Sequence, residues 1–371
     1  MNLIGTKARS LVAASGILLL FAATVPARAE ESAYLVHNLV SDGSAPSDHI
    51  DPRLVNPWGI AFNPTGPVWI SDNGTNVSTL YDGLGNPLPL VVQIPGAGGN
   101  GVAGPPTGIV FNGTTGFEVT TANPARFIFA TEDGVLSGWA PAVDPTHAVA
   151  MVDNSASGAV YKGLAIGAGG SGSLLYATDF HNARVDVFDS KFAPVTTAGG
   201  FVDPGMPAGF APFGIQAIAG DIYVTYARQD EARHDDVKGA GLGFVDVFDA
   251  NGHLARRLVS RGRLNAPWGL ALAPTAFGKF GGRLLVGNFG DGTVNAYDLA
   301  SGQFVGRLRN ADRSPIRVDG LWGICFGNGF ASQPADTLYF TAGPGGESHG
   351  LYGRIEAVTG PGNGARGEPN D

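Results

Sequence analysis

The sequence is nearly without cysteine. Cys325 is the single cysteine among 371 residues, so the chain contains no disulfide of its own and its stability has to come from packing. Cys325 stands in the apolar segment GICF (323–326), where we expect a small buried hydrophobic residue rather than a nucleophile.

Basic side chains are also few. The chain has 23 lysines and arginines against 32 aspartates and glutamates, which gives a net charge of −9. Nucleic acids and anionic lipid surfaces bind basic faces, so we expect no nucleic acid and no membrane as a partner. We expect instead a small molecule or a protein as the ligand of a monomeric chain.

Common motifs of catalysis and cofactor binding are missing too. The sequence contains no G-x-S-x-G, P-loop, H-E-x-x-H or C-x-x-C pattern. We therefore expect no organic cofactor. Ca²⁺ or another divalent metal stays open as a cofactor.

Only one long apolar run is present, and it lies at the N-terminus. Lys7 and Arg9 precede a run of about 15 residues that ends before Ala27-Arg28-Ala29. A membrane span needs about 20 residues, so a cleaved secretory signal over residues 1–29 is favoured over an anchor. We expect the chain to be exported to the periplasm or the extracellular space, with a disordered tail over residues 359–371.

Glycine, by contrast, is abundant at 57 residues, and it marks an internal repeat. The segment PWGIAF (57–62) returns five times in related form, with spacings between the central glycines of 49, 55, 51, 55 and 54 residues. The six central glycines are Gly59, Gly108, Gly163, Gly214, Gly269 and Gly323. A glycine at one fixed inner position leaves room where inner strands crowd together.

Each copy of the repeat continues as further strands. A second apolar run, a polar turn and a third run such as RVDVFDS (184–190) follow, and a weaker fourth run follows in most copies. Four antiparallel strands per unit predict an all-β protein with six propeller blades over residues 33–358. A two-sheet sandwich would not explain the period. The sixth unit ends at its third strand (351–358), so we expect the N-terminal strand (33–42) to close the last blade.

The whole stretch from the first blade to the last resembles a known family. Segments such as NPWGIAF, SDNGTNVSTLYDG, GLGFVDVFDANG and LLVGNFGDGTVNAYD are similar to those of exported bacterial six-bladed propellers of NHL type. Some members of that uncharacterised family are associated with PEP-CTERM sorting systems. The resemblance implies the fold and export but no reaction. This C-terminus shows no apolar sorting segment, so release is expected rather than retention.

Candidate ligand-binding residues precede the repeated glycines. The starts of the first strands surround one mouth of the propeller channel, the usual ligand position. The candidates are Trp58, Lys162, Phe213, Trp268 and Trp322. The aromatic side chains predict a stacking platform and Lys162 a contact to an anionic group. Packing between blades, with a solvated Lys162, is the alternative and the commoner fate of such residues.

Candidate metal ligands lie on the same face. They are Asn73, Glu132, Asp179 and Asn288 at or near the ends of second strands, and Asp230 and Asp235 in the long insertion at 228–243. Oxygen ligands of this kind suit Ca²⁺, and gluconolactonase-type propellers use similar residue types. Ordinary turn chemistry is the alternative.

Three histidines of this face are the candidate catalytic or Zn²⁺-binding residues: His181, His234 and His349. A solvated acidic loop is the alternative for the insertion that holds His234. Two functions stay open. The first, which the lack of a catalytic set favours, is an exported module that binds a small ligand or a protein at the channel face. The second is a metal-dependent lactonase-like hydrolase or lyase.

Overall fold

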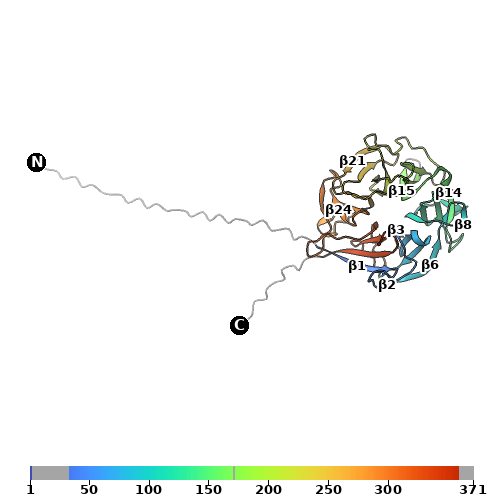
Figure 1. Ribbon diagram of the computed structural model, residues 1–371, viewed down its shortest axis with the longest axis horizontal. Helices are drawn as coiled ribbons and strands as arrows, with labels where there is room; N and C mark the ends of the chain where they lie inside the picture. The colour runs from blue at the N-terminus through green and yellow to red at the C-terminus, as the bar shows by residue number, and fades with distance from the viewer. Residues whose placement is uncertain (2–32, 170–171, 359–371) are drawn as a thin grey trace. The chain divides into compact units, whose positions relative to one another are not determined.

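The repeated glycine segments form the first strands of six separate sheets. They are β3 (Pro57–Phe62), β9 (Pro106–Phe111), β15 (Tyr161–Gly169), β18 (Phe210–Ile218), β22 (Pro267–Leu272) and β26 (Leu321–Phe326). The computed structural model describes Met1 and residues 33–169 and 172–358. Its six sheets stand around a common centre (Figure 1), which confirms the six-bladed β-propeller.

The other strands complete the blades by antiparallel pairing in chain order. Blade one adds β4 (Val68–Asp72), β5 (Val77–Tyr81) and β6 (Pro87–Gln93), and blade two adds β12 (Phe127–Thr131), β13 (Val135–Trp139) and β14 (Val149–Asp153). Blade three adds β16 (Gly172–Asp179) and β17 (Arg184–Phe188). Blade four adds β19 (Asp221–Arg228), β20 (Phe244–Phe248) and β21 (Leu254–Ser260), and blade five adds β23 (Leu284–Asn288), β24 (Val294–Tyr297) and β25 (Phe304–Arg307). Blade six adds β27 (Leu338–Ala342) and β28 (Leu351–Val358).

Several short elements lie outside the sheets of the six blades. They are the strand pairs β7 (Pro95–Gly96) with β8 (Gly99–Ala103) and β10 (Glu118–Thr120) with β11 (Asn123–Pro124), and the 3₁₀ turns η1 (Asn73–Thr75), η2 (Ser155–Ser157) and η3 (Gly278–Phe280). Blade three has three strands among the described residues instead of four. An isolated bridge between Phe188 and Pro194 stands where a fourth strand would pair.

The N-terminal strand closes the ring. β1 (Ala33–Ser41) pairs antiparallel with β28, with Ala33 opposite Val358 and Ser41 opposite Leu351. The short strand β2 (His49–Ile50) then pairs with β1 in parallel. The predicted closure of the last blade is therefore confirmed. β28 is paired on both sides, with β1 and with β27, so it presents no open edge.

Close approach between blades explains the repeated glycine. A Cβ on Gly214 would lie 2.0 Å from the carbonyl oxygen of Trp268, and one on Gly269 would lie 2.7 Å from that of Trp322. The inner strands of neighbouring blades are thus too near for a side chain at this position. The core lies between blades, in clusters such as that of Leu285, Ile324 and Phe340.

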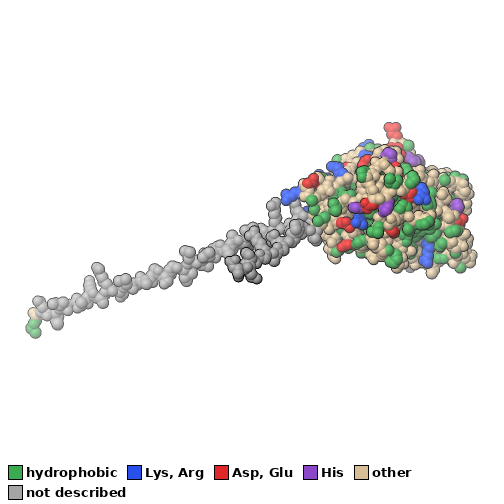
Figure 2. Space-filling model, turned by 90° about the horizontal axis from the view of Figure 1, so that it is seen from below, with side chains coloured by type: hydrophobic (Ala, Val, Ile, Leu, Met, Phe, Trp, Pro, Cys, Tyr) green, Lys and Arg blue, Asp and Glu red, His purple; other side chains and the backbone are tan. Residues whose placement is uncertain are grey.

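One face of the ring gathers the starts of the first strands and the turns between second and third strands. In blade one Pro57 pairs with Asp72, and in blade five Pro267 pairs with Asn288. This face holds the channel mouth considered below. Figure 2 is turned by 90° from the view onto the ring, and on the side drawn there hydrophobic, acidic, basic and histidine side chains are interspersed.

Two expectations fall on residues that the structure does not describe. Apart from Met1, the predicted signal over 1–29 lies outside the described residues, and so does the predicted tail over 359–371. Among the residues that are described, no helix is long and apolar enough to cross a membrane.

Candidate functional site at the channel mouth

Aromatic side chains from several blades fill the centre of the mouth. Trp322 is sandwiched between Trp58, at a centroid distance of 3.5 Å, and Phe289, at 3.8 Å. Trp268 packs edge-on against Trp58 and Trp322, and Phe213 is tilted against Trp322. All five rings are at most 9% exposed. The rings therefore pack between blades, and in this conformation they offer no open stacking platform.

Lys162 is buried above this aromatic cluster. Its side chain is 1% exposed, and its Nζ donates to Oε1 of Glu132 at 2.5 Å and to Oδ1 of Asp235 at 3.3 Å. The same Nζ lies 4.9 Å from the ring centroid of Trp58. Burial disfavours the charged form, but the two carboxylates outweigh it and hold the pKa of Lys162 above its ordinary value. A solvated Lys162 is thus not what the structure shows.

A chain of amides continues from Glu132 across the mouth. Nδ2 of Asn73 donates to Oε2 of Glu132 at 2.8 Å, and Nδ2 of Asn56 donates to Oδ1 of Asn73 at 3.2 Å and to Oε2 of Glu347 at 3.1 Å. Asn56 also accepts a bond from Nε1 of Trp322 at 3.0 Å. Blades one, two and six are thereby linked through side chains alone.

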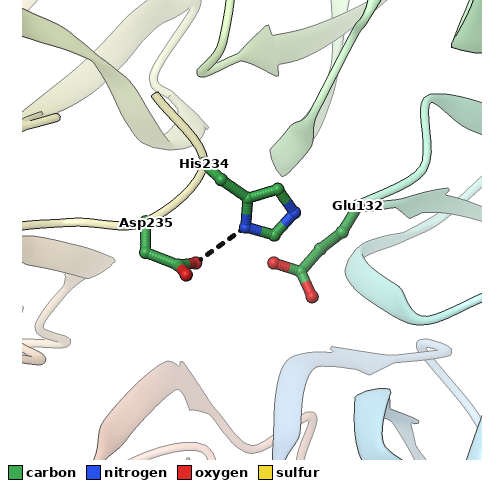
Figure 3. A group of neighbouring side chains, drawn as sticks. All are labelled: Glu132, His234 and Asp235. Atoms are coloured by element: carbon green, nitrogen blue, oxygen red, sulfur yellow. Dashed lines mark hydrogen bonds and ion pairs between the residues drawn. The ribbon is translucent and has the colours of Figure 1, made fainter. Parts of the chain in front are cut away.

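The blade-four insertion (228–243) contributes the remaining wall. Backbone N–H groups of His234 and Asp235 donate to Oδ1 of Asp230, at 2.9 and 3.3 Å, so Asp230 shapes the turn. The imidazole of His234 lies between Glu132 and Asp235, with Nδ1 3.0 Å from Oδ1 of Asp235 (Figure 3). This bond, together with Lys162 and against some desolvation, lowers the pKa of Asp235 to about 2, and it raises the pKa of His234.

Asp236 has a carboxylate oxygen without a hydrogen-bond partner among the described residues. This oxygen, Oδ2, is buried. Burial raises the pKa of Asp236 to about 7, although Lys162 and Lys238 act in the opposite direction, and Glu347 adds to the rise. Burial also raises the pKa of Glu347. The mouth thus contains two acidic groups whose negative charge is poorly compensated.

Several predicted residues stay in their own turns. Asp179 accepts bonds from the backbone N–H and the side chain of Asn182, and Asn288 donates to Oδ1 of Asp291. These contacts are the ordinary turn chemistry that the sequence left open.

The three candidate histidines are not gathered. His349 binds Asp42, with Nδ1 2.9 Å from Oδ2. Within the described ranges, one group of potential metal ligands converges. It consists of Glu132, His234 and Asp235, whose ligand atoms all lie within 4.8 Å of one another. Neither His181 nor His349 belongs to it.

Sequence reasoning missed Asn56 and Glu347 and gave no role to Asp236. Glu347 lies in the turn between the second and third strands of blade six, the same position that supplied candidates in other blades. Asn56 and Glu347 both have positive φ, of 45° and 70°. Such backbone is uncommon for these residue types outside tight turns, and no sequence pattern announces it.

Comparison with known proteins places the chain among proteins of unassigned activity. "Uncharacterized protein R648" of Acanthamoeba polyphaga mimivirus is 34% identical over 358 residues, which cover 93% of this chain and 86% of the relative. "Uncharacterized protein L690" of the same virus is 33% identical over 333 residues, covering 86% of this chain and 85% of the relative. No family model matches the chain.

Solved structures agree on the fold alone. A structural genomics protein of unknown function from Bacteroides thetaiotaomicron superimposes with a TM-score of 0.55 at 12% identity, covering 88% of this chain and 77% of that one. A glucose dehydrogenase reaches 0.52 at 14% identity, covering 82% of this chain and 98% of that one. The NHL type, the bacterial origin, the link to PEP-CTERM sorting and the export of this protein stay predictions. At the level of sequence, the chain belongs to the family of the mimivirus proteins R648 and L690.

Proposed function

We propose that the protein is a binding module whose channel mouth takes a small, positively charged ligand such as an amine. The observation that carries this proposal is the buried Oδ2 of Asp236, which lacks a partner among the described residues. A buried polar atom without a hydrogen bond costs about 1–3 kcal/mol, so a ligand that donates to it would recover that cost.

The balance of charge at the mouth supports a cationic ligand. Lys162 is already engaged by Glu132 and Asp235. The other ammonium, that of Lys238, lies over the ring of Phe289 at 4.0 Å from its centroid. Asp236 and Glu347 are left as acidic groups for which a ligand ammonium would favour ionisation. Export to the periplasm or extracellular space and a monomeric state remain parts of this proposal.

A metal-dependent hydrolase or lyase is the second candidate function. It is favoured by the convergence of Glu132, His234 and Asp235, whose ligand atoms lie within 4.8 Å (Figure 3). Against it stands Lys162, whose Nζ is bonded to oxygens of both carboxylates. A divalent ion would have to compete with this ammonium for the same oxygens, so we rank the metal function second.

Calorimetric titration separates the two functions. The wild-type chain is titrated with spermidine, with neutral saccharides, and with Ca²⁺ and Zn²⁺, beside Asp236→Asn and Asp336→Asn. Asp336 is exposed on the loop between β26 and β27, on the opposite face. We expect saturable spermidine binding that Asp236→Asn weakens at least tenfold, about 1.4 kcal/mol, and that Asp336→Asn leaves unchanged. Absence of spermidine binding, or metal binding with turnover of a lactone, would reject the proposal.

A further inference from the structure

Arginine is concentrated in two short segments of this acidic chain. Residues 256–263 and 307–317 together contain eight of its arginines, although the net charge of the whole chain is −9. The first segment covers the end of β21 in blade four and the connection after it, and the second covers the end of β25 in blade five and its connection. The two blades are neighbours in the ring (Figure 1).

Some of these arginines have evident structural partners. Arg257 forms ion pairs with Asp203 and Asp246, and the guanidinium of Arg261 lies over the ring of Phe244 at 5.3 Å. Nη2 of Arg256 donates to the carbonyl oxygen of Leu299. Arg257 and Arg261 thus make contacts within blade four and Arg256 reaches blade five, and these three arginines do not enter the inference.

Four others gather around one turn of blade five. This arginine cluster consists of Arg263, Arg307, Arg309 and Arg317. The carbonyl oxygen of Arg263 accepts bonds from Asn288 and Asn295, which places its backbone against β23 and β24. Arg317 donates through Nη1 to the carbonyl oxygen of Asp291 at 2.9 Å, in the turn between the same strands.

The remaining two members of the cluster follow the outer strand. Arg307 pairs with Asn295 in the ladder, and the N–H of Leu308 bonds to Val294, so the ladder continues and Arg307 and Arg309 project to the same side. Burial, followed by the positive charges of Arg263, Arg317 and Arg309, lowers the pKa of Arg307, although Asp291 acts against the shift. The guanidinium of Arg307 therefore lies within electrostatic range of the other three arginines.

The arginine cluster lacks matching carboxylates. None of its four side chains forms an ion pair with an acidic side chain among the described residues. Asp291, the acidic residue in its midst, uses Oδ1 to accept bonds from the N–H and hydroxyl of Thr293 and from Asn288. Arg263, Arg309 and Arg317 are exposed to solvent. Within the described part of the chain, these four arginines thus have no ion-pair partner, and three of them lie at an accessible surface.

An exposed aromatic ring completes the surface. Phe304 is 43% exposed, and the guanidinium of Arg263 lies 5.7 Å from its ring centroid. This cation–π contact is a weak attraction that places the guanidinium beside an accessible apolar ring.

We propose that the arginine cluster of blade five is a binding site for a multiply charged oxyanion, that is, for a ligand bearing phosphate or sulfate groups. The guanidinium fork matches the oxygens of such groups and bonds to them in pairs. A dianion or trianion would offset the positive charge around Arg307, which Asp291 offsets only in part. The site is separate from the acidic channel mouth, and it does not depend on the function proposed there.

The test is titration of the full chain with inorganic pyrophosphate at low ionic strength. The variant Arg309→Gln/Arg317→Gln is compared with Arg126→Gln/Arg228→Gln, which removes the same charge from exposed arginines in blades two and four. We expect saturable binding that the first pair weakens at least tenfold and the second pair by less than twofold. Circular dichroism verifies that each variant is folded, and Arg309→Lys/Arg317→Lys, which keeps the charge but loses the fork, should give an intermediate affinity.

Two results would overturn the proposal: no saturable binding of pyrophosphate by the wild-type chain, or equal weakening in both glutamine pairs, which would show a general charge effect. A second arm identifies the source of the oxyanion. Inorganic sulfate that displaces pyrophosphate would show a site for phosphate and sulfate groups alike, and failure of sulfate to displace it would show a site for phosphate groups.

Discussion

Lys162 is the residue on which the electrostatics of the channel mouth depend, because its buried ammonium neutralises Glu132 and Asp235. We expect Lys162→Met to lower the free energy of unfolding by about 3 kcal/mol, since Glu132, only 14% exposed, would keep its charge without a cation. Urea unfolding at neutral pH measures the change. Lys279→Met, which removes an exposed lysine, should change stability by less than about 0.5 kcal/mol. Equal stability of Lys162→Met and the wild type would show that the pair contributes nothing.

The same substitution should create a metal site. Without the ammonium, Glu132, His234 and Asp235 would keep three ligand atoms within 4.8 Å and no internal cation between them. We expect Zn²⁺ to raise the thermal unfolding temperature of Lys162→Met in a concentration-dependent way and to leave that of the wild type unchanged. A comparable Zn²⁺ effect on the wild type would instead favour the metal-dependent function.

Asp236 predicts a pH dependence of stability with a defined sign. Folded Asp236 keeps its proton up to about pH 7, whereas an unfolded aspartate loses it near pH 4, at a pKa of about 3.9. Between these values the unfolded chain binds fewer protons, so the contribution of Asp236 to stability is present below about pH 4 and is lost as the pH rises through about 7. Asparagine does not titrate, so Asp236→Asn lacks this pH-dependent contribution to stability. We expect the stability of the wild type relative to Asp236→Asn to fall across this window in urea unfolding, and parallel pH profiles would contradict the assignment.

At the scale of the element, the inner strands test the explanation of the repeat. A methyl group on Gly214 would meet the carbonyl oxygen of Trp268 at 2.0 Å, and backbone of the next blade cannot move aside as a flexible side chain can. We expect Gly214→Ala to lower the free energy of unfolding by at least about 1–3 kcal/mol. Gly113→Ala, whose methyl group meets the ring of Phe111 at 3.3 Å, should have a much smaller effect. Chemical denaturation of both variants provides the measurement, and similar losses would refute steric crowding as the cause.

The elements could be predicted because blades carry their pattern locally. Each first strand has its glycine and its apolar neighbours in one contiguous segment, and the period repeats this signal six times. The missing fourth strand of blade three could not be predicted in the same way. Its sequence after Phe188 still reads as a turn followed by apolar residues, and a single bridge to Pro194 is formed in place of a ladder.

The candidate site was only partly predictable, because its residues come from different blades. Glu132 and Asp179 occupy matching positions in the sequence, yet Glu132 reaches Lys162 and Asn73 while Asp179 is captured by Asn182 of its own turn. The link from Asn56 to Glu347 joins residues 291 positions apart. Local patterns identify which face such residues share. Whether a side chain bonds within its own turn or across the channel is decided by packing.

At the scale of the molecule, the chain separates opposite charges on its two proposed binding surfaces. The mouth contains the acidic groups Asp236 and Glu347, whereas the arginine cluster of blade five carries the excess of positive charge. A net charge of −9 hides this separation, because a sum over the chain says nothing of where the charges lie. Both surfaces draw residues from more than one blade or connection, so we expect each to depend on the closed ring.

The closing strand β1 tests that requirement. It buries Tyr34, Leu39 and Val40, each at most 2% exposed, and the N–H of Tyr34 bonds to the carbonyl oxygen of Arg309 in blade five. Each such side chain contributes about 1.5–3 kcal/mol on burial. We expect a chain that begins at residue 43 to unfold at a markedly lower temperature than one that begins at residue 30, and to self-associate through the exposed edge of β28. A synthetic peptide of residues 33–42 should restore the unfolding temperature in proportion to its concentration, because it can add as the missing strand, whereas a scrambled peptide should not. Calorimetry and size-exclusion chromatography follow both effects, and an unchanged unfolding temperature of the shortened chain would show that closure by β1 is dispensable.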